Sequence, residues 1–407
     1  MANNKNTKVP NVPNLRFPEF QGEWEKYELG DICDIITDFV AAGSFASLRE
    51  NVKYYQENNY AQLIRTIDLK NNFTNSDFVY VDEVAYDFLW RVQLKEPNIV
   101  LPNIGANIGE KYYVKPQDLP KNKNVLGPNA ILLRSKCNDT HFVYFRLSTS
   151  SYDNEMKKLV GASGQPKFNK TDLKKVSLFM PSLIEQKRIA YFLALLEERI
   201  ATQNKIIEDL KKLKSAIIEK LYSDIQGKEY SYRQLFEVVN ERNKQMEYSN
   251  ILAASQEKGM VSRDDLNLDI QFERSNINTY KIVREGDYVI HLRSFQGGFA
   301  FSNKTGVCSP AYTILRPNAL LEYGYLSYYF MSYRFIKSLI IVTYGIRDGR
   351  SISVEEWLNL KISIPSKEHQ LHILKVLRSF DWKIENEEAY ATHLSNQKQY
   401  LLRQMFI

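Results

Sequence analysis

An internal repeat constrains the fold of this chain more than any other feature of its sequence. The segment PSLIEQKRIAYFLALLEERI, which begins at Pro181, resembles PSKEHQLHILKVLRSFDWKI, which begins at Pro365. The offset is 365 − 181 = 184 residues, and it holds without a gap to the C-terminus. Both segments open with Pro-Ser and place a glutamine five residues after the proline, at Gln186 and Gln370. Because a fixed offset over this length indicates duplication, we expect one structural module to occur twice.

Upstream of these segments the repeat continues, but its offset drifts. Ile99–Leu101 resembles Tyr288–Ile290 at an offset of 189, whereas Tyr27–Leu29 resembles Arg233–Leu235 at an offset of 206. The first copy therefore carries 206 − 189 = 17 extra residues between these two matches. We expect the two copies to differ most in this stretch.

The globular part of each copy has the pattern of a mixed α+β module. Short runs rich in Val, Ile, Tyr and Phe, as in NIVLPNIGANIGEKYYV and GDYVIHLRSFQGGFAF, predict strands. Helical spacing occurs in HFVYFRLSTSSYDNEMKKLV and GYLSYYFMSYRFIKSLI. The predicted organisation is an N-terminal tail at 1–23, a first module at 24–180, a first long helix at 181–226, a second module at 227–364 and a second long helix at 365–407.

After each proline the apolar residues are spaced three and four apart, which predicts two helices of about 40 residues, or about 60 Å, each. Polar residues interrupt both stripes at matching positions: Gln203 and Lys214, then Glu387 and Lys398. A continuous apolar seam must be buried against a partner helix, and the other copy is the nearest candidate. We expect the residues that pair the helices to be Leu193, Ile200, Ile207, Leu210, Ile217, Leu377, Ile384, Leu394 and Leu401.

Two arrangements of these helices fit the pattern. In the favoured one they form an antiparallel coiled coil, and the two copies are related by a pseudo-two-fold axis. In the alternative, each helix folds back on its own module, which would leave most of the seam uncovered.

Ser182, with Glu185 three residues later, also predicts a capping box at the start of the first helix. The second copy carries His369 where Glu185 stands, so we expect a weaker box there.

Composition narrows the class of protein. The net charge is only +6, from 54 Lys and Arg against 48 Asp and Glu, so a partner bound by charge alone is not required. The 26 Tyr and 21 Phe suit hydrogen bonding to and stacking on nucleic acid, although such rings are also common in β-rich cores. No run of about 18 apolar residues is present, and the polar N-terminus is unlike a secretory signal. Three scattered cysteines, Cys33, Cys137 and Cys308, predict reduced and buried thiols, and hence a cytoplasmic location.

Two divergent modules, each closed by a P-S-x-x-E/H-Q helix start and a long heptad helix, resemble the specificity subunit of type I restriction–modification enzymes. The resemblance covers nearly the whole chain from about Trp24. It implies that each globular module is a target-recognition domain that reads one half of an asymmetric bipartite DNA site. The paired helices would then serve as a ruler for the unread spacer and as a docking surface for methyltransferase subunits.

The resemblance also implies a chain without catalytic activity. Its partners would be double-stranded DNA, two methyltransferase (modification) subunits and restriction/translocase subunits, which methylate adenine or restrict unmodified DNA. S-adenosylmethionine, ATP and magnesium would belong to those partners, and this chain would bind no cofactor, metal or membrane. In agreement, the sequence has no G-x-x-x-x-G-K-[ST] phosphate loop, no Asn-Pro-Pro-aromatic tetrapeptide and no zinc-ligand spacing. The alternative is a coiled-coil scaffold whose modules bind proteins.

Candidate DNA-binding residues come from three places. Two aligned glycine-bracketed loops, at 161–168 and 345–352, carry amide and cationic side chains, although ordinary turns have the same composition. Two further loops follow matched strands and offer the amide and guanidinium groups that read adenine and guanine. The third place is the longer stretch of the first module. The candidates are Tyr54, Tyr55, Gln56, Asn103, Asn107, Gln165, Lys167, Arg293, Gln296, Arg347 and Arg350.

Overall fold

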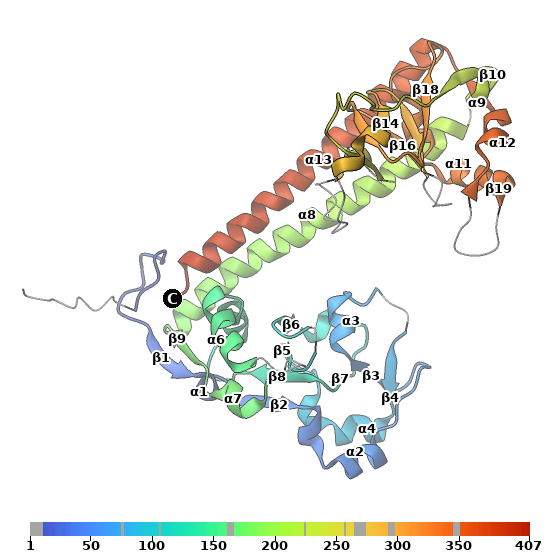
Figure 1. The fold of residues 1–407 in the computed structure, drawn as a ribbon. Helices are drawn as coiled ribbons and strands as arrows, with labels where there is room; N and C mark the ends of the chain where they lie inside the picture. The colour runs from blue at the N-terminus through green and yellow to red at the C-terminus, as the bar shows by residue number, and fades with distance from the viewer. Residues whose placement is uncertain are drawn as a thin grey trace, which may run out of the picture. The chain divides into compact units, whose positions relative to one another are not determined.

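The computed structural model describes residues 11–74, 77–105, 107–160, 167–223, 225–255, 258–263, 274–291, 298–344 and 351–407. These residues form two compact units (Figure 1). Unit 1 comprises Met1–Thr202 together with Ala391–Ile407, and unit 2 comprises Gln203–Tyr390. Each unit therefore contains one globular module and a part of both long helices.

The core of unit 1 is a four-stranded antiparallel sheet in the order β2 (Ile35–Asp38), β8 (Ala130–Arg134), β5 (Asn98–Pro102), β6 (Tyr112–Val114). A second sheet has the order β4 (Val79–Val81), β3 (Ala61–Ile64), β7 (Asn124–Leu126), in which β3 and β7 are parallel. A third pairs β1 (Glu25–Glu28) with β9 (Ser177–Met180). The helices are α1 (Leu29–Ile32), α2 (Phe45–Asn51), α3 (Thr66–Lys70), α4 (Glu83–Phe88), α5 (Thr140–Leu147), α6 (Ser150–Val160) and α7 (Lys170–Lys174), with 3-10 turns η1 (Phe39–Ala42), η2 (Trp90–Val92) and η3 (Pro116–Asp118).

Unit 2 repeats this plan. Its four-stranded antiparallel sheet has the order β11 (Phe236–Val239), β18 (Thr313–Pro317), β15 (Tyr288–Ile290), β16 (Phe299–Phe301). The two-stranded pairs are β10 (Lys228–Ser231) with β21 (Lys361–Ile364), β12 (Leu252–Ser255) with β13 (Gly259–Ser262), β14 (Lys281–Val283) with β17 (Gly306–Cys308), and β19 (Thr343–Tyr344) with β20 (Ser351–Ile352). The helices are α9 (Tyr232–Leu235), α10 (Tyr325–Tyr329), α11 (Tyr333–Ser338) and α12 (Val354–Asn359), with η5 (Arg274–Thr279) and η6 (Leu339–Val342).

The predicted duplication and the mixed α+β class are confirmed by these matching sheets. In unit 1 the longer stretch of sequence lies between β2 and β5 and forms α2, β3, α3, β4 and α4. The two copies differ there, as expected, because this segment builds the second sheet of the first module.

The two long helices are α8 (Leu183–Ser223, 41 residues) and α13 (Lys367–Gln404, 38 residues). Within each unit they lie side by side and run in opposite directions (Figure 1). Three polar contacts define the register: Glu197 with Lys398 in unit 1, and Lys214 with Asp381 and Gln203 with Glu387 in unit 2. Because 197 + 184 = 381 and 214 + 184 = 398, the two ion pairs are repeat equivalents. The antiparallel pairing is confirmed, and the alternative of helices folded back separately is wrong.

The expected apolar seam is covered to different degrees. Leu193 and Leu377 are fully buried, and Ile207, Ile384, Leu394 and Leu401 are also buried. Ile200, Leu210 and Ile217 are half-buried. At the end of α8 the burial moves by one position, to Ile218 and Tyr222. The reason is that this last part of the helix contacts the core of unit 2 rather than α13 alone.

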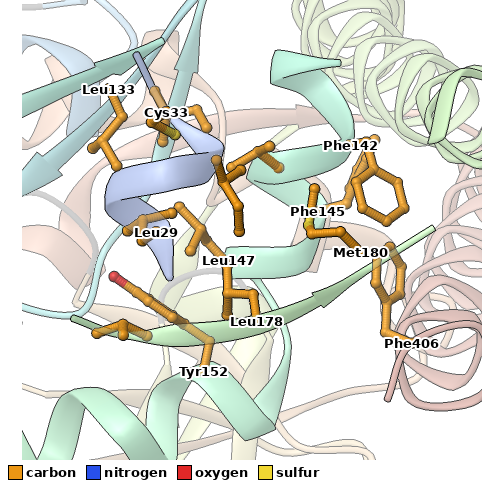
Figure 2. Packing of buried hydrophobic residues seen from close by; sticks show 14 of the residues in the cluster. Leu29, Cys33, Leu133, Phe142, Phe145, Leu147, Tyr152, Leu178, Met180 and Phe406 are labelled. Carbon is orange, nitrogen blue, oxygen red and sulfur yellow. The ribbon is translucent and has the colours of Figure 1, made fainter. Parts of the chain in front are cut away.

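Each globular core is closed by the end of the helix that follows the other module. In unit 1, Leu401, Leu402, Met405 and Phe406 belong to the core, and Figure 2 shows Phe406 reaching toward Phe142. In unit 2 the repeat-equivalent residue, 406 − 184 = 222, is Tyr222. Its hydroxyl donates a 2.5 Å hydrogen bond to the carbonyl of Tyr325. Residues at equivalent positions of the repeat therefore pack into equivalent places in the cores of the two units.

The repeated glutamine attaches each helix start to its module. Gln186 is buried, and its amide donates to the Pro181 carbonyl and to Asn138 Oδ1, both at 2.9 Å. Its oxygen accepts from the Asp139 amide at 3.0 Å. Gln370, also buried, donates to two backbone carbonyls at 3.0 and 3.1 Å and accepts from a backbone amide at 2.8 Å. The shared motif thus satisfies buried polar groups where helix and module meet.

The predicted capping box forms only in part. The Glu185 amide donates to Ser182 Oγ at 3.4 Å, but the Glu185 carboxylate does not return to the Ser182 backbone. It is buried and accepts two 2.7 Å hydrogen bonds from Arg16, plus one of 3.4 Å from Trp24 Nε1. A buried carboxylate is more strongly stabilised by a guanidinium than by one backbone amide, which explains the departure. The described part of the predicted tail is thereby held against unit 1.

The carboxylates of the helix ion pairs also contact the modules. In unit 1, His141 Nε2 on α5 lies 3.8 Å from Glu197 Oε2. In unit 2, the Tyr328 hydroxyl on α10 donates a 2.5 Å hydrogen bond to Asp381. Each module is therefore joined to both long helices through one carboxylate.

The cysteine prediction is partly wrong. Cys33 and Cys308 are buried, but Cys137 is exposed, because it lies in the turn between β8 and α5. None of the helices in the described ranges has the length and apolarity needed to cross a membrane.

Candidate nucleic-acid interface

The structure brings two of the predicted residues together. Asn103 directly follows β5, and its carbonyl accepts a 3.1 Å hydrogen bond from the Phe168 amide. Its side-chain amide donates to the Phe168 carbonyl at 3.3 Å, while Ile104 forms an antiparallel bridge with Lys167. Lys167 is exposed. Residues 167–168, which end the glycine-bracketed loop, therefore meet the loop after β5, and a cation lies at this junction.

Asn107 lies further along the same loop and is held by α3. Lys70 at the end of α3 donates to Asn107 Oδ1 at 2.9 Å and pairs with Glu110 at 2.7 Å. Burial raises the pKa of Glu110, but hydrogen bonds from Lys70 and Tyr112 outweigh this effect and hold the pKa below its usual value. The oxygen of Asn107 is thus already occupied, and its side chain is oriented by an internal contact.

The three candidates in the longer stretch have different surroundings. Tyr54 and Gln56 are exposed, as base or phosphate contact requires. Tyr55 is half-buried and pairs with Tyr80 through backbone hydrogen bonds of 2.8 and 2.9 Å. Its hydroxyl donates to Asp82 at 3.0 Å. Tyr55 therefore anchors the segment to β4, and its two neighbours face solvent.

Five predicted residues lie outside the described part of the chain. They belong to the segments 161–166, 292–297 and 345–350, the second of which connects β15 with β16 and the third β19 with β20. These residues, which stay predictions, are Gln165, Arg293, Gln296, Arg347 and Arg350.

Sequence reasoning missed a further group of cations beside the Tyr54–Gln56 segment. Lys121 Nζ lies 5.2 Å from the centre of the Tyr80 ring and donates to Asn58 Oδ1 at 2.7 Å. Lys123 Nζ lies 3.6 Å from the centre of the Tyr60 ring. We call this group, with Lys95 and Tyr86, the lysine–tyrosine patch; its members are Asn58, Tyr60, Tyr80, Tyr86, Lys95, Lys121 and Lys123.

The patch presents positive charge in fixed positions. In the described part of the chain, none of its three lysines has a carboxylate within ion-pair distance. A hydrogen bond to the Tyr60 hydroxyl and the more distant Glu83 carboxylate raise the pKa of Lys123, so it stays charged at neutral pH. An ammonium held over an aromatic face keeps its charge while losing some of its freedom, which favours contact with phosphates.

The parallel pairing of β3 and β7 explains how the patch forms. Asn58–Tyr60 precedes β3 and Lys121–Lys123 precedes β7, so the two segments lie at the same end of the sheet. They are about 60 residues apart in sequence, and this strand pairing brings them together. In the sequence, the patch is indicated by the Lys-Asn-Lys triplet at 121–123. A single sequence does not show that this triplet contacts a tyrosine far away in the chain.

Among the residues that the structure describes, no three or more His, Cys, Asp or Glu side chains are grouped as metal ligands would be. What the described site offers is exposed amides, phenol rings and lysines. This set suits hydrogen bonding to base edges and phosphates.

Comparison with known proteins gives a consistent result. The family model described as "Type I restriction modification DNA specificity domain" matches twice, over residues 21–212 and 227–394. The putative type I restriction enzyme MjaX specificity subunit of Methanocaldococcus jannaschii is 24% identical over 422 residues, covering 97% of this chain and 95% of that protein. The MjaVIII specificity subunit of the same organism is also 24% identical, over 95% of this chain and 92% of its own length.

Two solved structures share the fold. The S subunit of a type I restriction–modification system from M. genitalium superposes with a TM-score of 0.53 at 14% identity, covering 97% of this chain and 99% of its own. A chain from a structural study of complex assembly and conformational transition in the type I R-M system gives a TM-score of 0.57 at 13% identity, with coverage of 94% and 97%.

Proposed function

This chain belongs to the type I restriction–modification DNA specificity family, and from that membership we propose how its parts recognise DNA. It is the specificity subunit of such a system and has no catalytic role of its own. Each module reads one half of an asymmetric bipartite DNA site. The observation that carries this function is the repeated match of the specificity domain to both halves of the chain.

In the first module we assign DNA contact to two regions. The first is the junction of the loop after β5 with the loop before α7, which holds Asn103, Asn107 and Lys167. The second is the lysine–tyrosine patch with the exposed Tyr54 and Gln56. The lysines, which have no carboxylate partner among the described residues, would contact phosphates, while the amides would read base edges.

For the second module, the corresponding proposal rests on sequence alone. Arg293, Gln296, Arg347 and Arg350 lie in loops that align with the first-module loops, so we assign them the same role.

We propose that the paired helices set the gap between the two half-sites. Inserting one heptad after both Gln203 and Glu387, which face each other, should lengthen the gap and leave both half-sites unchanged. A changed half-site sequence would argue against this role. The measurement is methylome sequencing of a host that carries the variant.

The partners are inferred from the family, which assembles with modification and restriction subunits. We propose that two methyltransferase subunits dock on the first halves of the two long helices, where apolar side chains are exposed. On α8 these are Ile184, Tyr191 and Leu195, and on α13 they are Leu371 and Trp382. S-adenosylmethionine, ATP and magnesium would act in those partners, and the complex would work on DNA in the cytoplasm.

The central experiment is selection from a random-sequence duplex library by the full chain, alone and with its methyltransferase partner. We expect enrichment of two short motifs separated by a fixed unspecified gap. Absence of any enrichment with the partner present would instead favour the scaffold alternative.

The role of the lysine–tyrosine patch has its own test. The double substitution Lys121→Gln and Lys123→Gln should weaken binding to all duplexes uniformly. The plot of log K against log salt concentration should become shallower by about 2, because each lost phosphate contact reduces the magnitude of its slope by about 0.9. Lys26→Gln, which removes an exposed lysine on β1, is the matched control. A slope equal to that of the control would remove the patch from the interface.

A further inference from the structure

A cavity of about 570 Å³ in unit 1 is used by none of the roles assigned above. It lies against β2, the edge strand of the four-stranded sheet, and is also lined by η2 and α7. Its polar lining comes mainly from Thr37, Trp90, Arg91, Arg134, Lys170 and Lys174. Four of these six side chains are cationic, which distinguishes the cavity from the apolar cores beside it.

Two of the four cations are neutralised by carboxylates. Lys170 pairs with Asp38 at 2.8 Å, and Arg134 pairs with Glu96 at 2.9 Å. Arg91 has no carboxylate within ion-pair distance among the described residues. Lys174 likewise has none in those ranges. Two positive charges are therefore available to a ligand.

One carboxylate also lines the cavity and opposes an anion. Asp34 accepts hydrogen bonds from the backbone amides of Lys136 and Cys137, and these lower the pKa of Asp34. The Asp34 carboxylate is thus already hydrogen-bonded to backbone donors on the turn after β8. The cations on η2 and α7 come from the other elements that surround the space.

Thr37 provides independent evidence for a ligand. It is 8% exposed, and its hydroxyl has no hydrogen-bond partner in the described part of the chain. Buried hydroxyls are nearly always hydrogen-bonded, and one left alone is unfavourable. A ligand oxygen in the cavity would supply the missing acceptor.

Trp90 extends the site toward solvent. Its side chain is 63% exposed, and the Arg91 guanidinium carbon lies 4.8 Å from the centre of its ring. This contact orients the guanidinium, which presents paired N–H donors to a tetrahedral oxyanion. An ammonium, a guanidinium and a hydroxyl around one space form a donor set that matches phosphate oxygens.

We propose that this cavity binds a phosphate group. The phosphate can come from the backbone of the DNA duplex, in which case the inference rests on the proposed function, or from a free phosphate ion or ester. Both sources offer the same oxyanion to Arg91, Lys174 and Thr37.

The test uses the full chain and two variants, the double substitution Arg91→Gln with Lys174→Gln and the single substitution Thr37→Val. Lys175→Gln is the matched control, because Lys175 is the exposed neighbour of Lys174 and does not line the cavity. Binding of inorganic phosphate is measured by ³¹P line broadening. Binding of a duplex without the recognition site is measured as a function of salt.

For a backbone phosphate, the double variant should lower the salt slope by 1 to 2, since each contact contributes about 0.9, and the control should not. For a free phosphate, the double variant should abolish line broadening and leave the slope unchanged. Thr37→Val should weaken the same interaction several-fold without lowering the thermal midpoint, since its hydroxyl makes no internal bond. If neither readout differs from the control, the proposal is overturned.

These outcomes separate the inference from the proposed function. If the unmodified chain with its partner enriches no bipartite motif but phosphate binding depends on Arg91 and Lys174, the function fails and the cavity assignment stands. If motif enrichment succeeds and neither readout depends on those residues, the cavity assignment fails alone.

Discussion

Replacing Phe406 with alanine should destabilise unit 1 without a matching effect in unit 2. The ring is 6% exposed and lies 5.3 Å from the Phe142 ring and 6.2 Å, edge-on, from the Trp24 ring. Loss of a buried phenylalanine costs about 3–5 kcal/mol in a packed core. Since Phe406 lies beyond the end of α13 at Gln404, the backbone beside it can partly relax, and we expect about 3 kcal/mol.

Hydrogen exchange of the full chain measures this prediction unit by unit. A loss of about 3 kcal/mol corresponds to roughly a hundredfold fall in protection, which should appear in the amides of α5. The amides of α10, in unit 2, should change much less. Arg403→Ala, at an exposed position one turn earlier, is the control and should cost no more than about 0.5 kcal/mol.

Two results would refute the reasoning. Unchanged protection of α5 would mean that the chain end does not contribute to the core of the first module. An equal loss in α5 and α10 would mean that the two cores do not open separately.

Three other predictions follow from individual residues. Burial raises the pKa of Glu197, but the imidazole and ammonium groups beside it outweigh this effect and place the pKa below its usual value. The stabilisation that Glu197 provides is therefore complete above the unfolded-state pKa of about 4.3 and is lost as pH falls through the lower folded pKa. Glu197→Gln should make the thermal midpoint depend less on pH in that acidic range. An unchanged dependence on pH would contradict this prediction. Burial raises the pKa of both Cys33 and Cys308 to about 12, so a thiol reagent at pH 8 should label the exposed Cys137 quickly and the others only after unfolding. Gln186→Leu leaves buried backbone groups unpaired and should cost about 1–3 kcal/mol in urea unfolding; a cost near zero would show that water replaces the side chain.

The repeat made the architecture predictable, because a pattern that occurs in both copies can be seen twice within one sequence. Gln186 and Gln370 stand at the same place in both, and both bind the groups around the helix start. The spacing of apolar residues likewise predicts which helix face is buried. It could not predict the shift to Ile218 and Tyr222, since that depends on contact with a module whose shape the helix sequence does not describe.

The candidate site was predictable only where it was local. Lys167 was selected from the composition of its loop and Asn103 from a loop that follows a matched strand, and the strand bridge beside them was not foreseeable. Lys121 and Lys123 were missed because their role depends on the parallel pairing of β3 with β7. Glu185 shows the opposite error. A local motif predicted a backbone contact, and Arg16, 169 residues away, took its place.

The hydrogen bond from the Leu15 amide to the Gln404 carbonyl, at 2.8 Å, brings the beginning of the described chain to its end. As a consequence, two residues that are 404 − 15 = 389 positions apart in the sequence are direct neighbours within unit 1. Opening the chain between Ser223 and Lys228 and joining the segment before Leu15 to the segment after Gln404 by a linker would give a circular permutant. Its modules would be encoded in reverse order, yet every helix pairing would be kept. The order of the modules in the gene would then carry no information about the order of the half-sites on DNA.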